Sequence, residues 1–105
     1  MSAAAQSRMP HEKTLTAAWK LSCQGDLPIW TSYWEDAVNG SVVFGVRNAG
    51  KPNEERLLVR SQDEYTSTVQ NVYMGAEGEH GDYIVVTENS IYIVPNNIQS
   101  RHIGN

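Results

Sequence analysis

The sequence predicts an α+β fold in which one or two N-terminal helices pack on an antiparallel meander of roughly five strands, which could curl into a small open barrel. Helical spacing of apolar residues occurs only before residue 41. From residue 41 onward, short β-branched and aromatic runs alternate with turn residues, a pattern typical of strands. The connections between these runs are brief, and a parallel crossover needs about a dozen residues, so we expect antiparallel pairing.

A chain of 105 residues, 40% hydrophobic and 19% charged, has the size and composition of one globular domain. The N-terminal residues are small and polar without periodicity, so we expect a flexible arm over 1–9. A single domain should then occupy 10–96. The last residues are again mostly polar, which predicts a flexible tail over 97–105.

The first predicted element is a helix over 10–24. Pro10 suits the first helical position, and Glu12 places a negative charge near the positive end of the helix dipole. Gly25 follows at the point where helices commonly end with a left-handed residue, and Pro28 prevents continuation.

Residues 29–40 fit two structures. The run 29–34 is rich in strand-forming residues, which favours a strand turning at Asn39 and Gly40. Ser32 and Glu35 instead have the spacing of a capping box. The i, i+3, i+4, i+7, i+8 template of an amphipathic helix is filled by Trp30, Tyr33, Trp34, Ala37 and Val38. We favour a short second helix, with the strand as the alternative.

The remaining elements are predicted strands. Their ranges are 41–47, 56–61, 67–74, 83–88 and 91–94. The last two are apolar on both faces over most of their length, so they should lie centrally in the sheet and be covered on both sides.

The net charge and the cysteine content disfavour several classes of function. The net charge of -4 lowers the expectation of nucleic-acid binding, which depends on Lys and Arg. The single cysteine, Cys23, excludes an intramolecular disulfide. The sequence has neither an apolar run of about 20 residues nor a secretion signal at its start, so we expect no membrane association and an intracellular location, which also suits a virion or assembly component.

No pattern of catalytic or metal-binding residues stands out. Cys23 comes late in the predicted helix, where the dipole disfavours a thiolate, and we expect it on the inner side of that helix. The histidines, His11, His80 and His102, lack the spacing of zinc ligands. The acidic, glycine-rich loop 77–82 does not match a calcium-binding motif. We therefore predict no catalytic residue, metal or cofactor. A small enzyme or ligand-binding domain, with its site between helices and sheet, is one alternative.

A second alternative is a small β-rich nucleic-acid-binding domain. Its surface would be formed by Arg47, Lys51, Arg56 and Arg60, half of the eight Lys and Arg residues. On a strand, Arg56 and Arg60 point to the same side, and the aromatic Tyr65 follows, as in surfaces that bind single strands. Neighbouring carboxylates favour the simpler interpretation, an ordinary charged outer face.

The favoured function is a non-catalytic protein-interaction or assembly module, such as a structural component of a larger complex. All three tryptophans and Tyr33 lie between Trp19 and Trp34, and such residues dominate protein interfaces. The predicted interface is formed by Trp30, Tyr33, Trp34 and Val38, for a protein partner or self-association. The competing interpretation is that these side chains form the core between helices and sheet.

Overall fold

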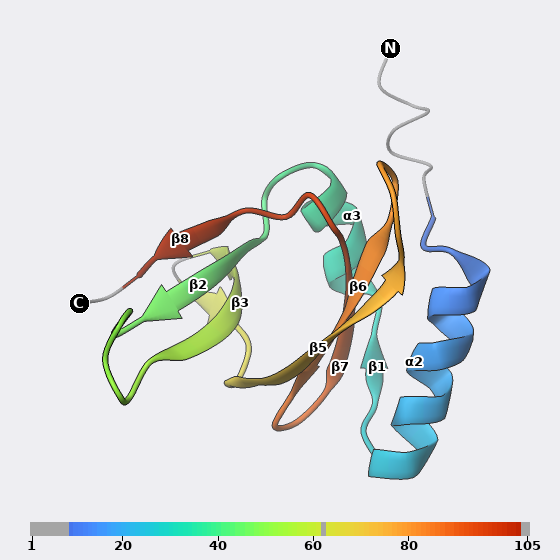
Figure 1. Ribbon diagram of the computed structural model, residues 1–105, viewed down its shortest axis with the longest axis horizontal. Coiled ribbons are helices and arrows are strands. Elements are labelled where there is room, and N and C mark those ends of the chain that lie inside the picture. The colour runs from blue at the N-terminus through green and yellow to red at the C-terminus, as the bar shows by residue number, and fades with distance from the viewer. Residues whose placement is uncertain (1–8, 62, 104–105) are drawn as a thin grey trace.

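The computed structural model describes residues 9–61 and 63–103, and within them it has two helices and two four-stranded sheets (Figure 1). The helices are α2 (Glu12–Gly25) and α3 (Ser32–Val38). The strands are β1 (Ile29–Trp30), β2 (Val43–Arg47), β3 (Glu55–Ser61), β4 (Glu64–Tyr65), β5 (Val69–Ala76), β6 (Asp82–Thr87), β7 (Ile91–Pro95) and β8 (Ser100–His102). The expected N-terminal arm lies, except for Met9, outside the described residues.

The α+β class is confirmed, but the single five-stranded antiparallel meander is wrong. Sheet A has the strand order β1-β7-β6-β5, and sheet B has the order β4-β3-β2-β8. Two of the pairings are parallel, β1 with β7 and β2 with β8. The strands β1, β4 and β8 have only two or three residues each, which is too short for a periodic pattern to reveal them.

The first helix forms as predicted, with different ends. His11 is the N-cap, so Pro10 precedes the helix and does not occupy its first position. Asp26, and not Gly25, takes the left-handed conformation at the C-terminal end, with φ 55° and its N–H bonded to the carbonyl of Ser22. Aspartate tolerates this conformation better than most residues that have a side chain.

Residues 29–40 contain both of the structures that their sequence suggests. Ile29 and Trp30 form β1, which pairs with β7, and the favoured helix follows as α3. The N-cap of α3 is Thr31, without a side-chain hydrogen bond, so the capping box expected from Ser32 is absent. Trp30 fills the first position of the helical template in the sequence, but in the structure it belongs to β1 and lies outside α3.

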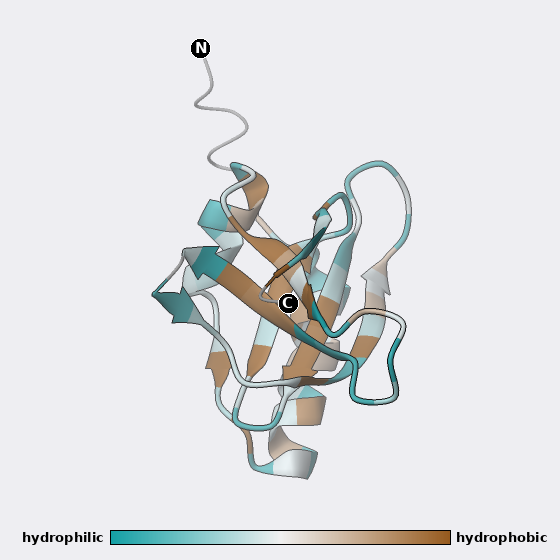
Figure 2. Ribbon diagram, turned by 90° about the vertical axis from the view of Figure 1, so that its left-hand side faces the viewer, coloured by the Kyte–Doolittle hydropathy of each residue, from teal (hydrophilic) through white to brown (hydrophobic). Residues whose placement is uncertain are grey.

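Sheet A carries α2 on one face and sheet B on the other, and α3 contributes side chains to the core clusters on both faces (Figure 1). The cluster between α2 and sheet A consists of Ala18, Trp34, Ile84, Ile91 and Ile93. The cluster shared by α3 and the two sheets consists of Tyr33, Ala37, Val42, Leu58, Val85, Tyr92 and Val94. Figure 2 shows hydrophobic residues along the strands and hydrophilic residues in the connecting loops.

The central position predicted for the last two apolar strands is confirmed. β6 and β7 are the interior strands of sheet A, and every residue of β7 is buried. The chain beyond β7 differs from expectation, because the segment 97–105 includes β8, which pairs with β2 through Ser100, Arg101 and His102.

The N-terminus of α2 is attached to sheet A through the buried Asp82, the first residue of β6. The backbone N–H of His11 donates to Asp82 Oδ2 at 3.0 Å, and the buried hydroxyl of Thr14 donates to Asp82 Oδ1. A Cβ on Gly75 would lie 2.4 Å from Thr14 Oγ1 and 2.6 Å from Asp82 Oδ1. Glycine at this position of β5 therefore permits the close approach of the helix.

Candidate interaction surfaces

The predicted aromatic interface is divided between core and surface. Tyr33 and Trp34 are 7% and 6% exposed and belong to the two core clusters, and Val38 packs against the cluster under α2. Trp30 is 50% exposed on β1, and Trp19 is 62% exposed on α2. Among the four predicted interface residues, the structure thus brings only Trp30 to the surface.

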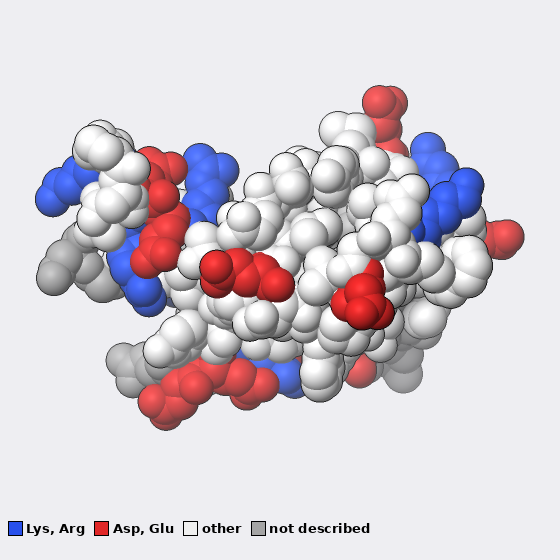
Figure 3. All heavy atoms as spheres, turned by 90° about the horizontal axis from the view of Figure 1, so that it is seen from below, with Lys and Arg blue, Asp and Glu red and all other residues white. Residues whose placement is uncertain are grey.

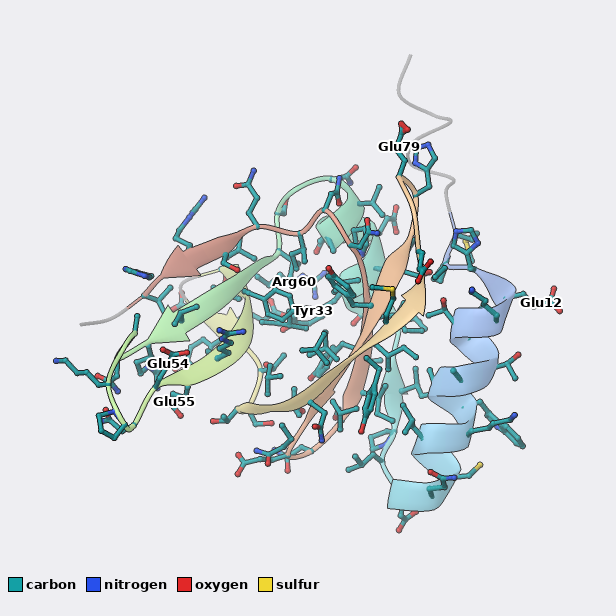
Figure 4. The ribbon with its side chains drawn as sticks, in the orientation of Figure 1. Glu12, Tyr33, Glu54, Glu55, Arg60 and Glu79 are labelled. Atoms are coloured by element: carbon teal, nitrogen blue, oxygen red, sulfur yellow. The ribbon has the colours of Figure 1, made fainter. Side chains whose placement is uncertain are left out.

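Tyr33 is held firmly in the core by its neighbours. Its ring meets that of Tyr92 edge-on, with centroids 5.0 Å apart, and the guanidinium of Arg60 lies 5.2 Å from its centroid. Figure 4 shows Arg60 beside Tyr33 in the middle of the molecule. Burial raises the pKa of both tyrosines; for Tyr33, repulsion from an ionised Tyr92 and from Glu64 adds to this increase, and the positive charge of Arg60 opposes it. A partner could not reach this ring in the folded protein.

The predicted basic surface does not form one free cationic face. Arg47 pairs with Glu55 at 3.0 Å, and Arg56 pairs with Glu54 at 3.6 Å. Arg60 pairs with Asp36 and, at 3.0 Å, with Glu64, and these bonds, led by the one to Asp36, raise the pKa of its guanidinium. Register places Arg47 opposite Glu55 and Arg56 opposite Val46, so Arg47 and Arg56 point to opposite faces of sheet B. Lys51 lies exposed in the connection between β2 and β3.

An open groove of about 770 Å³ lies on the face of sheet B that is turned away from the core residue Phe44. Its apolar lining includes Val43, Leu57, Val59 and Ile103, and its polar lining includes Arg47, Arg101 and Tyr65. Arg101 enters this site because β8 places it opposite Gly45. The sequence carries no signal for this placement, because it depends on a long-range parallel pairing.

One edge of sheet A, formed by β5, exposes several large apolar side chains. β5 has eight residues and pairs with β6 on one side, while its other side pairs with no strand in the described part of the chain. Three successive side chains are exposed, Val72 at 44%, Tyr73 at 43% and Met74 at 60%. The whole strand, VQNVYMGA, contains no charged residue and no proline. The sequence predicts this strand but not its place at an edge.

Tyr73 also borders an apolar hollow of about 230 Å³ beside the C-terminal half of α2. The hollow is lined mainly by Leu21, Leu27, Tyr73, Val86 and Ile91. In the view from below, Lys and Arg lie mainly at the two ends formed by sheet B and α2, and the surface between them is mostly uncharged except for two separate acidic groups (Figure 3). The β5 edge thus adjoins a surface on which apolar side chains can be buried.

Within residues 9–61 and 63–103, no group of three or more His, Cys, Asp or Glu side chains is placed to hold a metal ion. Cys23 is exposed, so its expected position on the inner side of the helix is wrong. Neither described helix has the length and apolar character needed to cross a membrane.

Comparison with known proteins identifies no relative: no family model, no curated protein and no solved structure matches the chain.

Proposed function

We propose that this chain is a non-catalytic protein-interaction or assembly module, which binds a protein by adding an extended strand to the β5 edge of sheet A. The observation that carries the proposal is the edge itself: a long, uncharged strand, one side of which pairs with no other strand among residues 9–61 and 63–103, with three adjacent exposed apolar side chains.

The backbone chemistry of a free edge supports a strand as the bound element. The outward N–H and C=O groups of an edge strand form a template for another strand, and main-chain hydrogen bonds then supply affinity. Natural edges are usually protected by charged residues, proline, very short length or β-bulges. β5 lacks the first two and is eight residues long, although bulges interrupt its pairing with β6 near each end.

The side chains of β5 offer a partner apolar area on both faces of the sheet. Tyr73 lies opposite Ile84 of the cluster under α2, whereas Val72 lies opposite Val85 of the cluster between the sheets. Adjacent residues of a strand point to opposite faces, so a docked strand would contact Tyr73 on one face and Val72 and Met74 on the other. Buried aromatic side chains of this kind commonly dominate binding energy.

The test is affinity capture with the tagged full-length chain, at low and high salt, offering both an untagged copy and an extract of the native source. Bound proteins are identified by mass and then purified for direct binding measurements. Binding should survive high salt. Val72→Lys should weaken it roughly tenfold or more, because the lysine ammonium would lose its hydration between β5 and the docked strand. Val72→Thr, which keeps the β-branched shape, is the matched control and should retain binding.

A second variant, Trp30→Ala, tests the interface predicted from the aromatic residues. Trp30 lies on β1, the opposite edge of sheet A, so its loss should leave Val72-dependent binding intact. Binding lost in Trp30→Ala but kept in Val72→Lys would move the interface to β1. Bound material that is sensitive to nuclease and lost at high salt would replace the proposal with nucleic-acid binding.

A further inference from the structure

We infer that the strand added to β5 is β5 of a second copy of this chain, paired antiparallel about a twofold axis. This inference rests on the proposed function and names its partner. In the resulting dimer, the two copies of sheet A would form one continuous sheet across the molecular boundary. Symmetric pairing of this kind uses the same surface of both copies and closes without leaving a free site for further growth.

Charge favours this junction as the meeting point of two copies. Each chain carries a net charge of -4, so two copies repel each other at long range. Along β5, from Val69 to Ala76, no charged side chain exists to face its counterpart in the other copy. Like charges directly opposite in a sheet are destabilising, so an uncharged edge is where two such molecules can pair.

The order of residues along β5 makes this edge complementary to itself when two antiparallel copies pair with Tyr73 of one opposite Tyr73 of the other. The two Tyr73 side chains then lie opposite each other on the face that carries α2. On the other face, Val72 of each copy lies opposite Met74 of the second copy. Directly opposite aromatic side chains stabilise a sheet, so the Tyr73 pair favours this register.

The other free edges of the described sheets are poor competitors for this pairing. They belong to β1 and β4, with two residues each, and to β8, with three. The ladder between β5 and β6 is regular only from Asn71 to Met74, because register shifts flank that stretch. A junction of this length buries a small area, so the dimer should be reversible and depend on concentration.

Sedimentation equilibrium over a wide range of protein concentration tests the inference. The wild-type mass should rise from that of a monomer toward that of a dimer, and Val72→Lys should shift the midpoint roughly tenfold or more to higher concentration. Val72→Thr should dimerise like the wild type. Circular dichroism and urea unfolding at low concentration check that each variant folds as a monomer.

Two double variants test the register. In the pairing centred on Tyr73, Val72→Lys with Met74→Glu places each lysine opposite a glutamate, so dimerisation should recover relative to Val72→Lys alone. Val72→Lys with Met74→Lys places like charges opposite and should remain monomeric. Equal behaviour of the two double variants would overturn this register.

The inference and the proposed function can fail separately. A wild-type monomer at all concentrations, with an identified different protein bound in a Val72-dependent manner, overturns self-pairing and leaves the proposed function standing. A monomer that binds no protein contradicts both. A dimer that Val72→Lys does not weaken shows that the copies meet elsewhere and overturns the β5 pairing.

Discussion

At the scale of single residues, burial and pairing decide what each aromatic or basic side chain can do. Tyr33 is enclosed by Tyr92 and Arg60, whereas Trp30, only three positions earlier, is half exposed. The Arg60 guanidinium forms ion pairs with Asp36 and Glu64, and it lies beside the Tyr33 ring. These contacts tie Arg60 and Tyr33 to their neighbours within the fold.

The buried tyrosines predict a loss of stability at alkaline pH. Burial raises the pKa of Tyr33 and Tyr92 above the ordinary value of 10.0. Above that pH the unfolded chain loses these protons before the folded protein does, so the free energy of unfolding should fall as pH rises. Below it, both states keep the protons and these tyrosines add no pH dependence.

Urea unfolding between pH 7 and 11, together with tyrosinate absorbance, measures this effect. Tyr92→Phe, compared with its own stability at pH 7, should show a shallower alkaline fall than the wild type, because phenylalanine has no proton to lose. Parallel falls in the two proteins would contradict a contribution from Tyr92.

At the scale of elements, the sequence predicts what is long and periodic and misses what depends on distant partners. α2 and the strands of five or more residues follow from their patterns. β8 escapes detection, and β1 is suggested only as part of the alternative strand over 29–34, because both short strands depend on pairing with distant partners, β2 and β7. The candidate surfaces could not be predicted from the sequence for the same reason. The edge position of β5 and the place of Arg101 in the groove of sheet B both depend on how distant strands pair.

The docking of α2 on β5 predicts an intolerance of side chains at Gly75. In Gly75→Ala the new Cβ would lie 2.4 Å from Thr14 Oγ1, so the helix must shift and its bonds to Asp82 must weaken. We expect a loss of about 1–3 kcal/mol in the free energy of unfolding. Gly25→Ala is the control, because its nearest neighbour would be Leu27 at 3.5 Å, an ordinary contact. Equal stability of both variants would show that the helix is not held closely there.

At the scale of the whole molecule, the two sheets and the two helices share buried side chains and should unfold as one unit. Leu58 of β3 belongs to the same cluster as Val85 and Tyr92 of sheet A. Sheet B, whose outer strands are two and three residues long, buries Leu58 against sheet A, so its core side depends on sheet A.

Leu58→Ala tests this coupling. Leu58 is 0% exposed, so its truncation should cost about 2–5 kcal/mol of unfolding free energy. The three tryptophans lie on α2, β1 and α3, and Trp34 packs in the cluster between α2 and sheet A, so their fluorescence reports elements other than the strands of sheet B. In urea, fluorescence and far-ultraviolet circular dichroism should shift together. The control is Leu15→Ala, at an exposed position, which should change the free energy of unfolding by less than about 1 kcal/mol. If fluorescence and circular dichroism gave separate transitions for Leu58→Ala, the protein would not unfold as a single unit.

The two parallel ladders also set the order in which the chain can fold during synthesis. They join Ile29 to Ile91 and Phe44 to Ser100, so each closes a loop longer than half of the 105-residue chain. Such distant contacts slow folding, because the entropy of loop closure opposes them before they add stability. During synthesis, β1 and β2 therefore wait until β7 and β8 have been made before their parallel ladders can form.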